Sequence, residues 1–138
     1  MRHDAGTLRT GRRTAQRRQL QEAAERMGAA FTVGDLVESA AATGERPSRA
    51  TAYRAVRAMC ASRILERIGE RDGHALYAHC AGAGHHHHLM CTSCGAVAET
   101  ACPLGPDADD AARRAGFVLT GHDVVLYGLC RECAGGRT

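Results

Sequence analysis

The chain has 138 residues, a formal net charge of +3 and an apolar share of 44%, which suits one medium domain or two small ones. It contains no apolar run near the ~20 residues that a membrane span needs, and no signal-peptide pattern opens it. We therefore expect a cytoplasmic protein without a membrane partner. In that compartment its seven cysteines indicate metal ligands rather than disulfide bonds.

The charge is divided unevenly along the chain. Residues 1–80 hold 14 arginines and 9 acidic residues, whereas residues 81–138 hold 4 arginines and 6 acidic residues, so the balances are +5 and −2. A basic first part joined to a Cys- and His-rich second part indicates a nucleic-acid-binding module coupled to a metal-binding module. The alternative is an arginine-rich surface that serves solubility alone.

The first part begins with a segment, residues 1–13, that lacks periodicity and is expected to form a mobile arm. A helix is predicted over residues 16–26, where good helix formers follow one another, and Thr14 is its candidate cap. Thr32 is the expected N-cap of a second helix over residues 33–41, and Asp35 would complete a capping box.

A third helix is predicted from Arg49 to Ser62, with Ser48 as its N-cap. Two β-like segments, residues 64–68 and 74–79, flank an Asp-Gly pair that is typical of a hairpin turn. Three helices followed by a hairpin are the order of a winged helix-turn-helix, whose third helix enters the major groove of DNA.

Candidate DNA contacts lie on the polar face of the third helix and on the first helix. Arginine is suited to the guanine edge, and Tyr53 can touch a thymine methyl, although packing against the hairpin is its alternative role. Phosphate contacts supply affinity without sequence information. The predicted DNA-binding residues are Tyr53, Arg54, Arg49, Ser48, Arg57, Arg17 and Arg18.

The second part is organised around four consecutive histidines, His85 to His88, that run into Cys91-x-x-Cys94. With a second pair, Cys130-x-x-Cys133, the chain offers four thiolates, which is the full complement of a tetrahedral structural zinc site. In an extended segment successive side chains point to opposite faces, so alternate histidines could serve two further metal sites. The alternative is a solvated polar loop.

Secondary structure in the second part is expected to be mixed. A flexible joint is predicted at residues 82–84, strands at residues 87–91, 96–100, 117–120 and 123–129, and a short helix at residues 107–115. We therefore expect an α+β protein with a winged-helix domain over residues 1–81, a hinge over residues 82–84 and a metal-binding domain over residues 85–138.

Several motifs follow one another along residues 14–133: Thr14-Ala15-Gln16-Arg17, Ala50-Thr51-Ala52-Tyr53-Arg54, Leu76-Tyr77, the run from His85 to Gly95, Glu99, Gly116-Phe117, His122 and Gly128-x-Cys130-x-x-Cys133. In these motifs the chain resembles the ferric uptake regulator family. The resemblance implies a homodimeric, metal-sensing repressor of operator DNA. Its N-terminal winged helix would bind DNA, and its small C-terminal α/β domain would dimerise and carry the zinc sites.

The resemblance is greatest to the zinc-sensing branch of that family. Iron- and peroxide-sensing members place a histidine ahead of the second helix, where this chain has residues 29–32 without histidine. Zinc-sensing members carry a cysteine shortly before the histidines, which matches Cys80. The regulatory zinc site implied by the resemblance, at the hinge, consists of Glu66, Cys80, His86 and His88. Its zinc would lock the angle between the two domains. A solvated Glu66 and a buried, inert Cys80 are the alternatives.

A possible third site is also implied by the resemblance, with ligands His85, His87, His122 and one acidic residue. The segment that should carry the acid is one residue shorter here, so Asp107 is the candidate and Asp109 the substitute. Cys60 is expected to pack under the third helix. Cys102 matches no ligand spacing and is expected to be a bystander.

Three functions compete. A zinc-responsive repressor is favoured, and a sensor of iron, manganese, nickel or peroxide within the same family is the first alternative. A zinc hydrolase is the second, but the chain lacks a His-Glu-x-x-His motif and an acidic base beside the histidines.

Overall fold

A computed structural model of the chain describes residues 4–81 and 86–135, without the side chains of residues 4–10 and 12. The chain divides into two compact units, Met1–Ala81 and Gly82–Thr138, which are described separately. The predicted hinge over residues 82–84 and the predicted ligand His85 lie outside the described residues.

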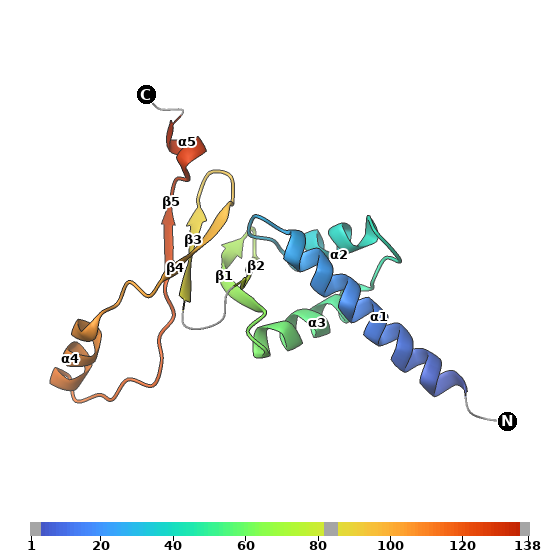
Figure 1. The fold of residues 1–138 in the computed structure, drawn as a ribbon, viewed down its shortest axis with the longest axis horizontal. Coiled ribbons are helices and arrows are strands. Elements are labelled where there is room, and N and C mark those ends of the chain that lie inside the picture. Colours follow the sequence, from blue (N-terminus) through green and yellow to red (C-terminus); the bar gives the residue numbers. More distant parts are fainter. Residues whose placement is uncertain (1–3, 82–85, 136–138) are drawn as a thin grey trace. The chain divides into compact units, whose positions relative to one another are not determined.

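The first unit is a winged helix (Figure 1). Three helices, α1 (Asp4–Arg26), α2 (Val33–Ala41) and α3 (Arg49–Ala61), precede the antiparallel hairpin of β1 (Leu65–Arg71) and β2 (His74–His79). The predicted order of three helices and a hairpin is confirmed.

Helix α1 is longer than the sequence suggested. It begins at Asp4, so the expectation of an irregular arm over residues 1–13 is wrong from residue 4 onward. Gly6 and Gly11 each cost a helix about 1 kcal/mol relative to alanine, but neither blocks the backbone hydrogen bonds as proline would. The surrounding residues, among them three arginines and Leu8, are good helix formers and carry the helix through both glycines.

Both predicted helix caps are present. At α2 the Thr32 hydroxyl accepts a hydrogen bond from the Asp35 backbone N–H at 3.1 Å, and the Asp35 carboxylate accepts one from the Thr32 N–H at 3.0 Å. At α3 the Ser48 hydroxyl accepts from the Thr51 N–H at 3.1 Å. These bonds satisfy N–H groups that a helix start leaves without intrahelical partners, which fixes where α2 and α3 begin.

The hairpin turns at Asp72 and Gly73, with φ angles of 51° and 79°. Two consecutive residues with positive φ make a turn whose twist matches the twist of the strands, as the Asp-Gly signal predicted. Near the turn the Arg71 guanidinium donates a hydrogen bond to the Asp35 carboxylate at 3.0 Å. The tip of the hairpin is therefore tied to the first turn of α2.

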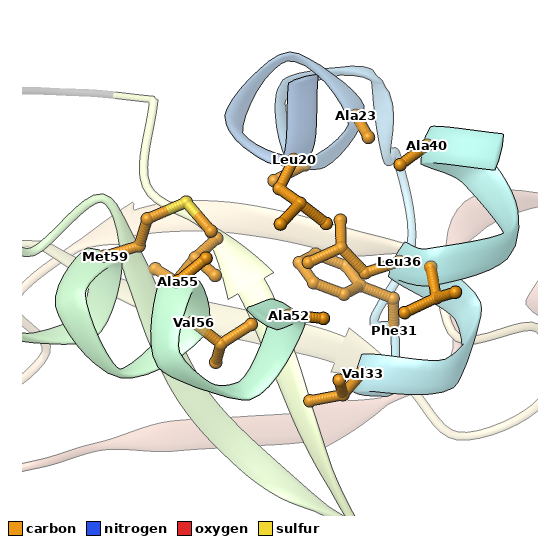
Figure 2. Packing of buried hydrophobic residues seen from close by; sticks show 13 residues of the cluster. Leu20, Ala23, Phe31, Val33, Leu36, Ala40, Ala52, Ala55, Val56 and Met59 are labelled. Atoms are coloured by element: carbon orange, nitrogen blue, oxygen red, sulfur yellow. The ribbon is translucent and has the colours of Figure 1, made fainter. Parts of the chain in front are cut away.

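The core of the first unit lies among the three helices and the base of the hairpin (Figure 2). Phe31 is fully buried, and its backbone pairs with that of Tyr77 through hydrogen bonds of 3.0 and 2.8 Å. The buried cluster comprises Leu20, Ala23, Ala24, Phe31, Val33, Leu36, Val37, Ala40, Ala52, Ala55, Val56, Met59 and Leu65. This packing holds α3 in place and leaves its opposite face in solvent.

The second unit is built on a three-stranded sheet of order β4-β3-β5. The central strand β3 (His86–Cys91) pairs antiparallel with β4 (Val97–Ala101) and parallel with β5 (Val125–Gly128). Two helices complete the unit, α4 (Pro106–Arg114) between β4 and β5, and α5 (Arg131–Gly135) after β5.

One predicted strand of the second unit is absent. Residues 117–120 form no strand, and the side chains of Phe117 and Val118 are 67% and 89% exposed. A strand forms only where another strand pairs with it, and periodicity reveals the apolar pattern but not the partner. Helix α4 likewise has no buried residue and stands away from the sheet in Figure 1. An apolar part of this unit is therefore exposed.

Candidate metal centres and nucleic-acid interface

Four cysteine sulfurs come together at one end of the β3–β5 pair. The ligand atoms of Cys91, Cys94, Cys130 and Cys133 all lie within 4.8 Å of one another. The parallel pairing of Cys91 with Gly128 brings the end of β3 beside the start of the second Cys-x-x-Cys. The first pair is closed by a turn in which Gly95 has a φ of 78°, a backbone conformation that favours glycine.

The cluster fits a tetrahedral metal. Zinc–sulfur bonds of about 2.3 Å place two sulfurs of a tetrahedral site about 3.8 Å apart, and the Cys94 and Cys130 sulfurs are 3.8 Å apart. Backbone N–H groups of Cys130 and Cys94 lower the pKa of the Cys91 thiol to about 6. The Ser93 hydroxyl lowers the pKa of Cys133, but the other three thiols outweigh it and raise that pKa to about 12. Crowded thiols resist a second negative charge, which a divalent cation would neutralise.

A second group of donors lies on one face of β3. The Nε2 atoms of His86 and His88 are 3.4 and 3.7 Å from one oxygen of Glu99. Glu99 is in β4, directly opposite His88 in the antiparallel pairing. The predicted pairing of His86 with His88 on one face is confirmed. Glu99 was not among the predicted ligands, although strand pairing places its carboxylate beside both rings.

The other two predicted regulatory ligands belong to the first unit. In the hairpin Glu66 pairs with Ala78, and the Cys80 N–H donates to the Ile64 carbonyl at 2.9 Å. Because side chains alternate along a strand, Glu66 and Cys80 project from the same face as diagonal neighbours.

The opposite face of β3 carries a third group of donors. His87 Nε2 lies 3.1 Å from His122 Nε2, and the Cys102 sulfur lies 3.2 Å from the same His122 atom. All three ligand atoms are within 4.8 Å of one another. The expected pairing of His87 with His122 is therefore observed, and Cys102, expected to be a bystander, belongs to the group.

The acidic ligand suggested for this third group does not join it. Asp107 is exposed in the first turn of α4, and neither Asp107 nor Asp109 belongs to any potential metal-binding group among the described residues. The donor that lies beside His122 is instead Cys102, immediately after β4. Cys60 packs against the core of the first unit, as expected. The pKa of its thiol is raised mainly by burial and to a smaller extent by the negative charge of Glu66.

The solvent face of α3 carries the residues predicted to contact DNA. Tyr53 is 49% exposed. Arg49, Arg54 and Arg57 on α3 and Arg17 and Arg18 on α1 are also exposed. Ser48 is exposed too, but its hydroxyl accepts the capping hydrogen bond of α3.

A hollow of about 150 Å³ between α1 and α3 gathers positive charge. Arg13 and Arg17 line it from α1, and Arg54 and Thr51 line it from α3. Arg54 also donates to the Thr51 hydroxyl at 3.4 Å. Three guanidinium groups around one hollow favour an anionic ligand such as a phosphate. Arg13 was not among the predicted contacts, because its position was assigned to the arm.

The fold and these groups define an α+β protein in which a winged-helix unit precedes a cysteine- and histidine-rich unit. The chain belongs to the ferric uptake regulator family, whose sequence description matches residues 9–127. The resemblance inferred from the motifs and the predicted fold class are thereby confirmed.

The names of individual relatives refer to different metals, iron in some and zinc in others. The ferric uptake regulation protein of Bordetella parapertussis is 39% identical over 89 residues, which are 64% of this chain and 63% of that protein. A zinc uptake regulator complexed with zinc and DNA superposes with a TM-score of 0.72 at 21% identity, covering 88% of this chain and 82% of that one. FurB of Mycobacterium tuberculosis, described as a zinc uptake regulator, superposes with a TM-score of 0.51 at 27% identity, covering 88% and 95%.

The aligned part of this chain thus spans slightly less than two thirds of the length of the Bordetella protein. Among the described residues, no helix is long and apolar enough to cross a membrane.

Proposed function

We propose that the protein is a zinc-responsive transcriptional repressor that binds double-stranded operator DNA as a homodimer. One zinc ion is structural and is held by Cys91, Cys94, Cys130 and Cys133. A second, regulatory zinc ion closes the hinge over residues 82–84 and orients the winged helices for DNA binding. In this role the protein is a cytoplasmic regulator and not an enzyme.

The observation that carries the proposal is the arrangement of the regulatory ligands within each unit. Glu66 and Cys80 share one face of the hairpin, and His86 and His88 share one face of β3 with Glu99 between them. Neither set alone supplies the four ligands of a closed zinc site with both thiolate and imidazole. A zinc ion that uses both sets would be bound only by the closed arrangement of the units, so zinc would shift the population towards that arrangement.

The choice of zinc rests on the donors. Thiolate with imidazole favours zinc over metals that prefer oxygen ligands. The relative from Mycobacterium tuberculosis named as a zinc uptake regulator supports this choice, whereas the Bordetella relative is named for iron. A sensor of iron, manganese, nickel or peroxide is the alternative function.

DNA binding is supported by the first unit. The exposed residues of α3 offer Tyr53, Arg54, Arg49 and Arg57 to base edges and nearby phosphates. Arg17, Arg18 and Ser48 are proposed phosphate contacts. The arginine-lined hollow between α1 and α3 would receive one phosphate of the backbone.

Homodimer formation is supported by the exposed apolar residues of the second unit. Phe117, Val118 and Leu119 are 67%, 89% and 42% exposed, and Tyr127 on β5 is 58% exposed. Large exposed apolar side chains that form one surface mark protein–protein contact sites. A second copy that pairs with residues 117–120 would supply the strand partner that this segment needs.

The test uses an operator fragment selected from random DNA with the zinc-loaded protein. We expect Cys80→Ala to lose at least a hundredfold of zinc-dependent operator affinity while remaining a folded dimer that retains structural zinc. Cys60→Ala is the matched control, because it removes a thiol of the same unit that is not a proposed ligand. Binding is measured by fluorescence anisotropy at fixed free zinc, and dimerisation by sedimentation.

Full zinc-dependent binding by Cys80→Ala would remove the hinge site from the mechanism. Titration of the unaltered protein with zinc, iron(II), manganese and nickel separates the two candidate functions. Operator binding that appears at a lower free concentration of zinc than of the other metals supports the zinc sensor. Binding that appears at a lower free concentration of another metal supports the alternative.

A further inference from the structure

The group formed by His87, Cys102 and His122 brings three potential ligand atoms to one point, although the Cys102 thiol also has the Leu104 carbonyl as a hydrogen-bond acceptor at 3.4 Å. His122 Nε2 is approached by His87 Nε2 at 3.1 Å and by the Cys102 sulfur at 3.2 Å. One imidazole nitrogen carries either a single lone pair or a single proton. The two contacts therefore amount at best to one bifurcated hydrogen bond, which is weaker than two separate bonds.

A metal ion would use all three atoms at once. Metal–nitrogen bonds of about 2.05 Å and a metal–sulfur bond of about 2.3 Å place tetrahedral ligand atoms about 3.4 to 3.6 Å apart. The observed contacts of 3.1 and 3.2 Å need to open by only a few tenths of an ångström to accept an ion. Each atom is the one that would face the ion, the Nε2 of each ring and the sulfur.

The sheet holds these donors together. His87 is in the central strand and pairs with Thr100 of β4, so Cys102 lies two residues further along on the same face. His122 precedes β5, which pairs with β3 on its other side. Side chains from both neighbouring segments thus meet over the buried ring of His87, which is 3% exposed.

We propose that Cys102, His87 and His122 form a metal site of the thiolate–diimidazole class, with Cys102 in place of the carboxylate suggested by the family resemblance. On binding, the Cys102 thiol loses its proton to solvent and its sulfur bonds to the ion. Three protein ligands suffice for an ion that keeps an exchangeable fourth position. A thiolate among imidazoles selects borderline divalent cations, zinc and cobalt, over manganese and magnesium.

Cobalt(II) is the probe, because a cobalt–thiolate bond gives a charge-transfer absorption that imidazole and carboxylate ligands do not give. The full-length protein is prepared with zinc in the four-cysteine cluster and with Cys80→Ala, so that the proposed regulatory thiol is absent. We expect one equivalent of cobalt per chain to produce the thiolate band. Zinc released during the titration is measured, so that cobalt entering the cysteine cluster is recognised.

The band should disappear in the variant carrying Cys80→Ala and Cys102→Ala, and it should persist in the matched control carrying Cys80→Ala and Cys60→Ala. His87→Gln or His122→Gln should lower cobalt affinity at least tenfold, since even outer partners of metal ligands contribute that much. Cys102→Ser, which conserves size, should also abolish the band if Cys102→Ala fails to fold.

The proposal is overturned if the band persists without Cys102, or if it appears only with release of zinc. It is independent of the proposed function, because the readout is metal binding and not operator binding. If the protein binds cobalt through Cys102 but its operator binding does not depend on zinc, the metal site proposed here stands and the proposed zinc-responsive function is contradicted.

Discussion

The two units of the protein are stabilised by different means. In the first unit, three helices and a hairpin surround a continuous apolar core that includes the fully buried Phe31, Leu36 and Leu20. Among the described residues of the second unit, Cys91 is the only buried apolar side chain, and His87 and His88 are the buried polar ones. Small domains bury too little apolar surface to be stable alone and rely on metals or association. The second unit would therefore depend on the proposed structural zinc and the proposed partner copy, whereas the first depends on its core.

The largest effect is expected from a substitution in the cysteine cluster, which should unfold the second unit and leave the first intact. Structural zinc contributes on the order of 10 kcal/mol to the folding of small zinc domains. Cys91→Ser should therefore abolish the structure of the second unit and the dimer, while the helical signal of the first unit remains. Zinc content, circular dichroism and sedimentation measure the three properties.

Arg131→Ala, an exposed position between the two cysteines of the second pair, is the matched control and should keep its zinc and its dimer. A strong chelator should reproduce the effect of Cys91→Ser on the unaltered protein. A zinc-free dimer with a native second unit would show that metal is not what stabilises it.

The second effect concerns the core of the first unit. Phe31→Ala removes a fully buried ring but keeps the backbone pairing with Tyr77, and such truncations cost about 3–5 kcal/mol. Urea unfolding followed by the helical signal should show this loss, with zinc content unchanged. Tyr53→Ala, an exposed aromatic on α3, should change stability by less than about 0.5 kcal/mol. Equal losses for the two variants would contradict the assignment of the core.

The smallest effect tests local structure at the start of α2. Thr32→Ala removes the hydroxyl that caps the Asp35 N–H and should cost about 1 kcal/mol in the same urea experiment. Thr32→Ser keeps the hydroxyl and should restore most of the stability. If serine were no better than alanine, the capping bond would not be the source of the effect.

The features that the sequence predicted well are those encoded by neighbouring residues. The caps at Thr32 and Ser48, the Asp72-Gly73 turn and the strands β3 and β4 each depend on a short segment. The four-cysteine cluster was also predictable, because two Cys-x-x-Cys pairs supply all the ligands of one ion. In each case the chemistry needs no knowledge of distant contacts.

The features that the sequence did not predict depend on which strands become neighbours. Glu99 reaches His86 and His88 only because β4 pairs with β3 in a particular register, and Cys102 meets His122 only because β5 lies on the other side. The absent strand over residues 117–120 is the opposite case, since its apolar pattern is present but its pairing partner is not among the described residues. The early start of α1 was not predicted, because residues 1–13 lack the apolar periodicity by which a helix is identified from sequence.

The alternation of the histidines along β3 has a consequence for the order in which ions could be acquired. A shift of β3 by one residue would move His87 to the side of Glu99 and turn His86 and His88 to the side of Cys102, exchanging the ligands of both faces. Cys91 belongs to the same strand, and its sulfur is held within the cysteine cluster. An ion bound there would fix the alignment of the whole strand. The metal sites would then fill in a fixed order. A newly made chain would need an ion in the cysteine cluster before the histidines on either face of β3 are placed to bind a second ion.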